Sequence, residues 1–287
     1  MLVDLVRVTT GDGVRLDGML QKPTPQTASD LAVDALLLVH GTGGSFFSSS
    51  LFDSFAERFV KLGVAVLRIN TRGHDLVSTA VTNEGARRQG AAYETVDDCR
   101  HDFNAWLDWL SGQGHARIGV VGHSSGAVKT IYSQTRQPHP AVSRLIAVSP
   151  PRLSYAWFEL SSMSAVFQET YREAEKHIKN GRPQALMEVA FPLPMLITAE
   201  GYVEKYGPEE RYNFLRYLDR LPYPTLFTFG SVEVADNVAF QALPESVEEH
   251  LAQSGRGRVE VIEGANHFYY GLHGVLIRCV EDWLVES

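Results

Sequence analysis

Gly122-His123-Ser124-Ser125-Gly126 is the stretch that decides the fold, because it matches the pattern Gly-x-Ser-x-Gly. This pattern is typical of a sharp turn that presents a nucleophilic serine at the end of a strand. The apolar, mostly β-branched residues 118–121 predict a buried parallel strand before the turn, and residues 127–132 can continue as a helix. Centring the pattern on Ser125 fails, since neither flanking position is then glycine. The stretch therefore predicts a strand–turn–helix unit with Ser124 as the candidate nucleophile.

Composition indicates a globular protein with a full core. The chain has 287 residues, of which 44% are hydrophobic, enough for one large α/β domain or two small ones. A formal net charge of −8 and the lack of a basic run argue against a nucleic-acid partner. No apolar stretch reaches the roughly 18 residues that a membrane span needs. We therefore expect a small-molecule substrate, with no signal in the sequence for an oligomeric state.

Targeting and cysteine signals are sparse. The first five residues, 1–5, include no positive charge and open no long apolar segment, so we expect no secretory signal. Cys99 and Cys279 are the only cysteines, and they lack the spacing of metal ligands. These features predict reduced thiols in a cytoplasmic protein. We expect no cofactor and no metal, because His, Cys and carboxylates do not cluster at ligand spacing.

Apolar runs alternate with helical patterns along most of the chain. Strands are expected as a pair within residues 1–23 and then at 35–39, 64–69, 118–121, 144–148, 225–229 and 258–262. Helices are expected at 51–60, 95–110, 127–132, 245–253 and 272–284. Residues 22–30 and 71–94 are predicted to be loops. Strands separated by helices predict an α/β fold, a mostly parallel sheet flanked by helices.

Residues 152–222 interrupt this alternation. They carry helical patterns and no convincing strand, which predicts a helical insert between a core of residues 1–151 and 223–287. Because it falls between two strands, we expect the insert to cover their C-terminal ends, where open α/β sheets bind ligands. Its aromatic residues could line a pocket or form the insert's own small core, and we favour the core for Tyr155, Trp157, Phe158, Phe167 and Tyr171.

A serine nucleophile needs a base, and the base needs an orienting acid. Of ten histidines, His267 is the best candidate base because it follows the last predicted strand and comes after Ser124, in the order Ser–acid–His. His273 is a distant second, since it lies in the predicted last helix. The acid should follow the strand at 225–229. We favour Glu233 there and keep Asp236 as its rival.

Acyl transfer also needs donors for the oxyanion that forms on the carbonyl oxygen. One donor is expected to be the backbone N–H of Ser125, the residue after the nucleophile. The other should come from the glycine-rich loop 40–44, with Thr42 favoured and Gly43 as the alternative. No Gly-Lys-Ser/Thr follows this loop, which disfavours a nucleotide-binding phosphate loop.

Four segments in this order resemble the α/β-hydrolase superfamily: His40-Gly41, Arg72-Gly73-His74-Asp75, Gly122–Gly126 and Asn266-His267. The resemblance spans the whole chain and implies an α/β-hydrolase fold, with the insert 152–222 similar to that superfamily's helical lid. Glu233 stands where most members place Asp. Residues 70–75, Asn-Thr-Arg-Gly-His-Asp, together with the insert, also resemble a branch that includes fungal siderophore-ester hydrolases. That branch would imply hydrolysis of an ester or amide of a fairly large polar substrate.

The sequence thus predicts a serine hydrolase that cleaves a carboxylic ester, amide or lactone through an acyl-enzyme. A carbon–carbon bond hydrolase or an acyltransferase could use the same triad, and a non-catalytic binding protein on this fold is the third reading. His74 and Asp75 could reach a substrate from the rim of the site or pack beneath the insert. We favour the packing role for both.

Overall fold

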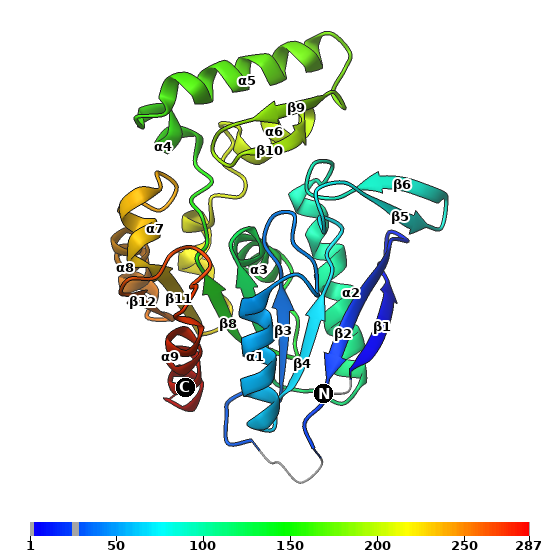
Figure 1. Cartoon of the computed structure of the whole chain (residues 1–287), viewed down its shortest axis with the longest axis vertical. Coiled ribbons are helices and arrows are strands. Elements are labelled where there is room, and N and C mark those ends of the chain that lie inside the picture. The colour runs from blue at the N-terminus through cyan, green and yellow to red at the C-terminus, as the bar shows by residue number, and fades with distance from the viewer. Residues whose placement is uncertain (1–2, 25–28, 287) are drawn as a thin grey trace.

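The computed structural model describes residues 3–24 and 29–286 of the chain. An eight-stranded sheet runs through the molecule in the order β1-β2-β4-β3-β7-β8-β11-β12 (Figure 1). β1 and β2 pair with antiparallel neighbours, and the other strand pairs are parallel. The mostly parallel sheet is therefore confirmed. Its strands are β1 (Asp4–Thr9), β2 (Arg15–Gln21), β3 (Ala35–Val39), β4 (Ala65–Ile69), β7 (Ile118–His123), β8 (Val142–Val148), β11 (Thr225–Gly230) and β12 (Gly257–Ile262).

Helices cover both faces of this sheet. Alternate side chains of β3 enter different cores: Leu36 and Leu38 pack on the side of α1 and α9, and Leu37 and Val39 on the side of α2 and α3. This division explains why the central strands are continuous apolar runs, since each face of each strand is buried. The helices of the core are α1 (Ser50–Lys61), the 3₁₀ turn η1 (Val96–Asp98), α2 (Cys99–Gly112), α3 (Ser125–Arg136), α7 (Ser231–Asp236), α8 (Leu243–Ser254) and α9 (His273–Glu286).

The insert between β8 and β11 lies beyond the carboxyl ends of the central strands, with α4, α5 and α6 uppermost in Figure 1. It contains α4 (Tyr155–Leu160), α5 (Ser164–Lys179), β9 (Leu186–Val189), β10 (Met195–Thr198), α6 (Ala199–Tyr206) and the 3₁₀ helix η2 (Phe214–Arg220). The expectation of no strand in this region is wrong, because β9 and β10 form an antiparallel pair. Each has only four residues, too few for the alternation of buried and exposed side chains to stand out in the sequence.

The aromatic residues of the insert mainly form its own core, as expected. Phe158 and Phe167 are fully buried, with ring centroids 5.5 Å apart. Tyr155 packs edge-on against both Phe167 and Tyr171. Trp157 has a different neighbour, the guanidinium of Arg152, which lies 3.9 Å from the indole centroid. The edge-to-face packing among Tyr155, Phe158, Phe167 and Tyr171 gives the small insert a compact aromatic core.

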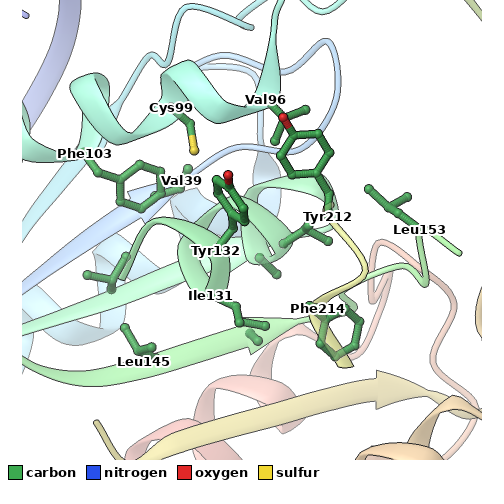
Figure 2. Packing of buried hydrophobic residues seen from close by; sticks show 14 of the residues in the cluster. Val39, Val96, Cys99, Phe103, Ile131, Tyr132, Leu145, Leu153, Tyr212 and Phe214 are labelled. Carbon is green, nitrogen blue, oxygen red and sulfur yellow. The ribbon is translucent and has the colours of Figure 1, made fainter. Parts of the chain in front are cut away.

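An aromatic contact and a buried ion-pair bridge are among the contacts that fasten the insert to α3 of the core. Figure 2 shows Tyr132 of α3 facing Tyr212, on the segment that returns from the insert, and their ring centroids are 5.0 Å apart. Lys129 of α3 and Lys205 of α6 both bind the carboxylate of Glu94, at 2.6 and 3.4 Å. Burial alone would raise the pKa of Glu94, but the two ammonium groups lower it to about 2. The helix that follows the serine turn is thus tied directly to the insert.

Residues 71–94, expected to be a loop, contain a second β hairpin. β5 (Ser78–Thr82) pairs antiparallel with β6 (Gly85–Gln89) and forms a separate two-stranded sheet. Only Ala80 and Gln89 of its ten residues are buried, so the hairpin has almost no apolar pattern by which the sequence could reveal it. Backbone pairing rather than side-chain burial defines this element. The other predicted loop, 22–30, includes residues 25–28, which lie outside the described part of the chain. Met1 and Leu2, part of the N-terminal stretch 1–5 considered for a secretory signal, also lie outside it.

The start of α3 lies against the end of β3 without room for a side chain between them. A Cβ placed on Gly126 would stand 2.4 Å from the carbonyl oxygens of both Val39 and His40. Backbone atoms cannot yield as a flexible side chain can, so this glycine sets how closely the helix approaches the sheet.

We predict that Gly126→Ala lowers the free energy of unfolding by about 2 kcal/mol, because the added methyl group forces α3 away from β3. Gly112→Ala is the matched control. Gly112 ends α2 with nothing within 4 Å of the added Cβ, so this change should leave stability equal or up to about 1 kcal/mol higher. Urea denaturation measures both. Equal stabilities for the two variants would contradict the close approach at Gly126.

Candidate active site

Ser124 occupies a strained turn between β7 and α3. Its φ of 56° and ψ of −126° lie outside the regions that a non-glycine residue prefers. The Ser124 N–H donates to the carbonyl of Val148 at 2.8 Å, which ties the turn to β8. A Cβ on Gly122 would come within 2.4 Å of the Gly126 carbonyl oxygen. Gly122 and Gly126, the glycines predicted to permit a tight turn, therefore lie where β7 and the start of α3 approach each other closely. The Ser124 side chain projects from this turn.

His267 and Glu233 meet across the neighbouring strand ends. Glu233 lies in α7, directly after β11, and His267 follows β12. His267 Nδ1 is 2.6 Å from Glu233 Oε2, and the Glu233 side chain is only 3% exposed. Asp236, the rival acid, is exposed at the far end of α7. Because a carboxylate only accepts, Nδ1 carries the proton and Nε2 of His267 is left as an acceptor.

The second oxygen of Glu233 is held by a buried network that the sequence did not reveal. Oε1 accepts from the Gly230 N–H at 2.7 Å and from the Ser149 hydroxyl at 2.5 Å. Ser149 in turn lies 3.0 Å from the Tyr269 hydroxyl. Ser149 and Tyr269 both have left-handed backbones, with φ of 49° and 55°, and both are fully buried. The only sequence signal for Ser149 is its position just after β8, the strand next to β11.

His123 also supports His267, although the sequence analysis used it only as the variable position of the pattern. Its Nε2–H donates to the His267 carbonyl oxygen at 2.8 Å, and the two imidazole rings pack with centroids 4.9 Å apart. Burial, helped by the nearby His267, lowers the pKa of His123 to about 3. His123 is therefore neutral and holds the backbone of His267 without competing for its proton.

The glycine-rich loop 40–44 lies beside the serine. A Cβ on Gly41 would stand 3.0 Å from Ser124 Cβ. The Thr71 N–H donates to His40 Nε2 at 3.1 Å, so the proton of this imidazole sits on Nδ1, which donates to the Gly41 carbonyl at 2.8 Å. Burial, together with the charge of Lys129, lowers the pKa of His40 to about 4. The neutral imidazole of His40 thus holds the loop 40–44 through its hydrogen bond to the Gly41 carbonyl.

Ser124, His267, Gly41 and Thr42 line one cavity of about 220 Å³. Thr42, the favoured donor, is part of this lining, whereas the alternative Gly43 adopts a φ of 66° and does not line it. Ser125 is the first residue of α3, so its N–H has no acceptor in a preceding helical turn. The structure therefore brings together four residues that the sequence singled out from distant parts of the chain.

The remaining sequence candidates lie outside the lining of this cavity. His273 donates from Nε2 to the Phe268 carbonyl at 3.0 Å and opens α9. His74 pairs with Asp75 at 2.9 Å, and the Asp75 N–H donates to the Gly44 carbonyl. The Asp75 N–H thus ties this pair to the loop 40–44, and the packing of both residues beneath the insert stays a prediction. Of the insert, Leu193 reaches the cavity, while the five aromatic residues named above do not line it.

Within residues 3–24 and 29–286, no group of three or more His, Cys, Asp or Glu side chains could hold a metal ion. In the same part of the chain, no helix combines the length and the apolar character needed to cross a bilayer. Cys99 and Cys279 are both free thiols.

Comparison with known families decides the relationship. The model of an alpha/beta hydrolase family matches residues 36–274, most of the chain. This protein is a member of the alpha/beta hydrolase family. The match covers the serine turn, the loop 40–44 and His267 together. None of the curated proteins matches the chain.

Solved structures share the fold of this alpha/beta hydrolase at low sequence identity. Est1E from Butyrivibrio proteoclasticus with bound ferulic acid is 15% identical, with a TM-score of 0.65 and coverage of 97% of this chain and 98% of its own. An esterase from Pyrococcus furiosus is 20% identical, with a TM-score of 0.59 and coverage of 99% and 92%. The alpha/beta hydrolase GrgF from Penicillium sp. sh18 is 14% identical, with a TM-score of 0.69 and coverage of 99% and 98%. The similarity to siderophore-ester hydrolases stays a prediction.

We predict that His40 and His123 stay neutral well below the pH at which an exposed histidine is protonated. In imidazole NMR spectra, their titration midpoints should fall near 4 and 3 rather than near 6.5. Because the unfolded chain then binds more protons than the native one, the free energy of unfolding should fall as the pH drops from about 6.5 toward 4. Midpoints near 6.5 for both rings would contradict the burial that keeps them neutral.

Proposed function

We propose that this alpha/beta hydrolase is a serine hydrolase that cleaves carboxylic esters, or closely related amides and lactones, through an acyl-enzyme. The observation that carries the proposal is the His267 Nδ1–Glu233 Oε2 hydrogen bond of 2.6 Å beside a cavity that Ser124 also lines. In this proposal Ser124 is the nucleophile, His267 the base and Glu233 the orienting acid. The N–H groups of Thr42 and Ser125 are the oxyanion donors.

The first half of the reaction uses each of these groups once. His267 Nε2 removes the Ser124 hydroxyl proton as Oγ attacks the substrate carbonyl. The negative charge that develops on the carbonyl oxygen is stabilised by the two backbone N–H groups. Glu233 stabilises the imidazolium without taking its proton. His267 then protonates the alcohol oxygen as the C–O bond breaks, and the acyl group stays on Ser124.

The second half of the reaction repeats these steps with water as the nucleophile. His267 deprotonates the water, the same two N–H groups bind the second oxyanion, and Ser124 leaves with the returned proton. The buried network of Gly230, Ser149 and Tyr269 supports the proposal, because it keeps the Glu233 carboxylate aimed at Nδ1 in both halves. His123 does the same for the backbone of His267.

We predict that a fluorophosphonate probe labels the wild-type chain and not Ser124→Ala, because the strained Ser124 Oγ is the nucleophile of the proposed reaction. Ser125→Ala is a suitable control, since it removes the adjacent hydroxyl and keeps the backbone N–H. That variant should still be labelled. Wild-type protein that resists the probe, or Ser124→Ala that reacts as readily as wild type, would refute the serine hydrolase proposal.

We predict that Glu233→Ala lowers kcat by a factor on the order of 10³–10⁴, because the correct His267 tautomer is lost. Asp236→Ala is the matched control, since it removes the carboxylate three residues along the same short helix. It should change kcat by less than about twofold. Hydrolysis of a soluble ester, with circular dichroism to verify folding, gives both values. A larger loss at Asp236 would assign the acid there instead.

A further inference from the structure

The cavity beside Ser124 offers a charged substrate group no carboxylate, ammonium or guanidinium partner among its described lining residues. Among the described residues that line it there is no Asp, Glu, Lys or Arg. Two of its histidines, His40 and His123, are kept neutral by the burial that lowers their pKa values to about 4 and 3. Apart from the imidazole of His267, its remaining polar groups are hydroxyls and backbone amides. A charged substrate group entering this space would lose its water without gaining a counter-ion.

Two aromatic side chains beside the candidate base face solvent. Phe268 and Tyr270 are 50% and 64% exposed, and both line the cavity. Their rings stack with centroids 5.5 Å apart and an interplanar angle of 25°. Phe268 also packs edge-on against His267 at 5.1 Å. We call Phe268 and Tyr270 the aromatic shelf. It extends outward from the imidazole that would handle the leaving group, and an exposed apolar surface at a cavity is typical of a ligand contact.

The chemistry of the triad decides which part of a substrate meets this shelf. His267 must protonate the alcohol oxygen as it leaves, so that oxygen has to lie within hydrogen-bond reach of Nε2. The carbonyl oxygen is directed instead toward the N–H groups of Thr42 and Ser125. The carbon attached to the leaving oxygen would therefore lie next to His267, and because Phe268 packs on His267 and Tyr270 stacks on Phe268, we expect its substituents to meet these two rings.

We infer that the preferred substrate is an ester whose alcohol part is uncharged and bears an aromatic ring, which stacks on the aromatic shelf. This inference rests on the proposed serine hydrolase function and adds the substrate class. Offset stacking on Tyr270 stabilises a planar ring more than a saturated ring of equal size. The formal net charge of −8 further disfavours an anionic alcohol part.

The test compares esters that share one acyl group and differ in the alcohol. Benzyl acetate and cyclohexylmethyl acetate have primary alcohols and rings of the same atom count, and 4-carboxybenzyl acetate adds a negative charge. We expect kcat/KM to be about fivefold higher for the benzyl than for the cyclohexylmethyl ester. The carboxybenzyl ester should be the poorest of the three. Tyr270→Ala should abolish the benzyl preference, and Tyr270→Phe should retain it.

Phe47→Ala is the matched control, because Phe47 is exposed to a similar extent, 66%, and does not line the cavity. This change should leave the benzyl preference intact. Equal kcat/KM for the benzyl and cyclohexylmethyl esters in the wild type, or a preference that survives Tyr270→Ala, overturns the inference. So does a wild type that prefers the carboxybenzyl ester.

The two proposals fail in distinguishable ways. A chain that fluorophosphonate labels at Ser124 but that hydrolyses neither neutral ester overturns the substrate class and leaves the serine hydrolase proposal standing. A chain that is not labelled overturns the proposed function, and the substrate inference falls with it.

Discussion

The left-handed backbone of Ser124 is the constraint on which the candidate site depends. A residue with a side chain adopts a φ of 56° only where its surroundings hold it there. Here the restraints come from the Val148 carbonyl on one side and from the contact of Gly126 with the carbonyls of Val39 and His40 on the other. The same contact places the loop 40–44 beside Ser124. The close approach of α3 to the end of β3 therefore sets the distance between the candidate nucleophile and the candidate oxyanion donors.

Around this turn the buried polar side chains have defined hydrogen-bond partners. Glu233 is a buried carboxylate whose charge is matched by three hydrogen bonds, from His267, Gly230 and Ser149. Each removes part of the desolvation cost that a buried carboxylate would otherwise carry. His40 and His123 are also buried, but as neutral rings. The cavity is thus lined by three histidines, and among them only His267 binds a carboxylate, that of Glu233 behind the cavity wall.

The insert is joined to this arrangement through α3. The Lys129–Glu94–Lys205 bridge and the Tyr132–Tyr212 contact both connect the helix behind Ser124 with the segments above it. Removing one partner of a buried ion pair destabilises a protein much more than removing one partner of a surface pair. The attachment is therefore specific at this end of the insert, while Leu193 is the part of it that reaches the cavity. The aromatic residues of the insert pack mainly on one another, beyond the carboxyl ends of the central strands.

Local sequence determined the parallel strands, the serine turn and the late histidine, because each leaves a pattern within a few residues. Continuous apolar runs such as 35–39 mark buried strands, and Gly-x-Ser-x-Gly needs only five positions. The acid was narrowed to Glu233 or Asp236, since chain order locates the loop but not the direction of a side chain. Only the tertiary structure shows that Glu233, and not Asp236, contacts His267, and only it reveals the hydrogen bonds of Ser149, Tyr269 and His123. Those residues act through hydrogen bonds between segments up to 144 positions apart, and such contacts leave no local period in the sequence. The short β9–β10 and β5–β6 pairs escaped prediction for a related reason, because backbone pairing rather than an apolar pattern defines them.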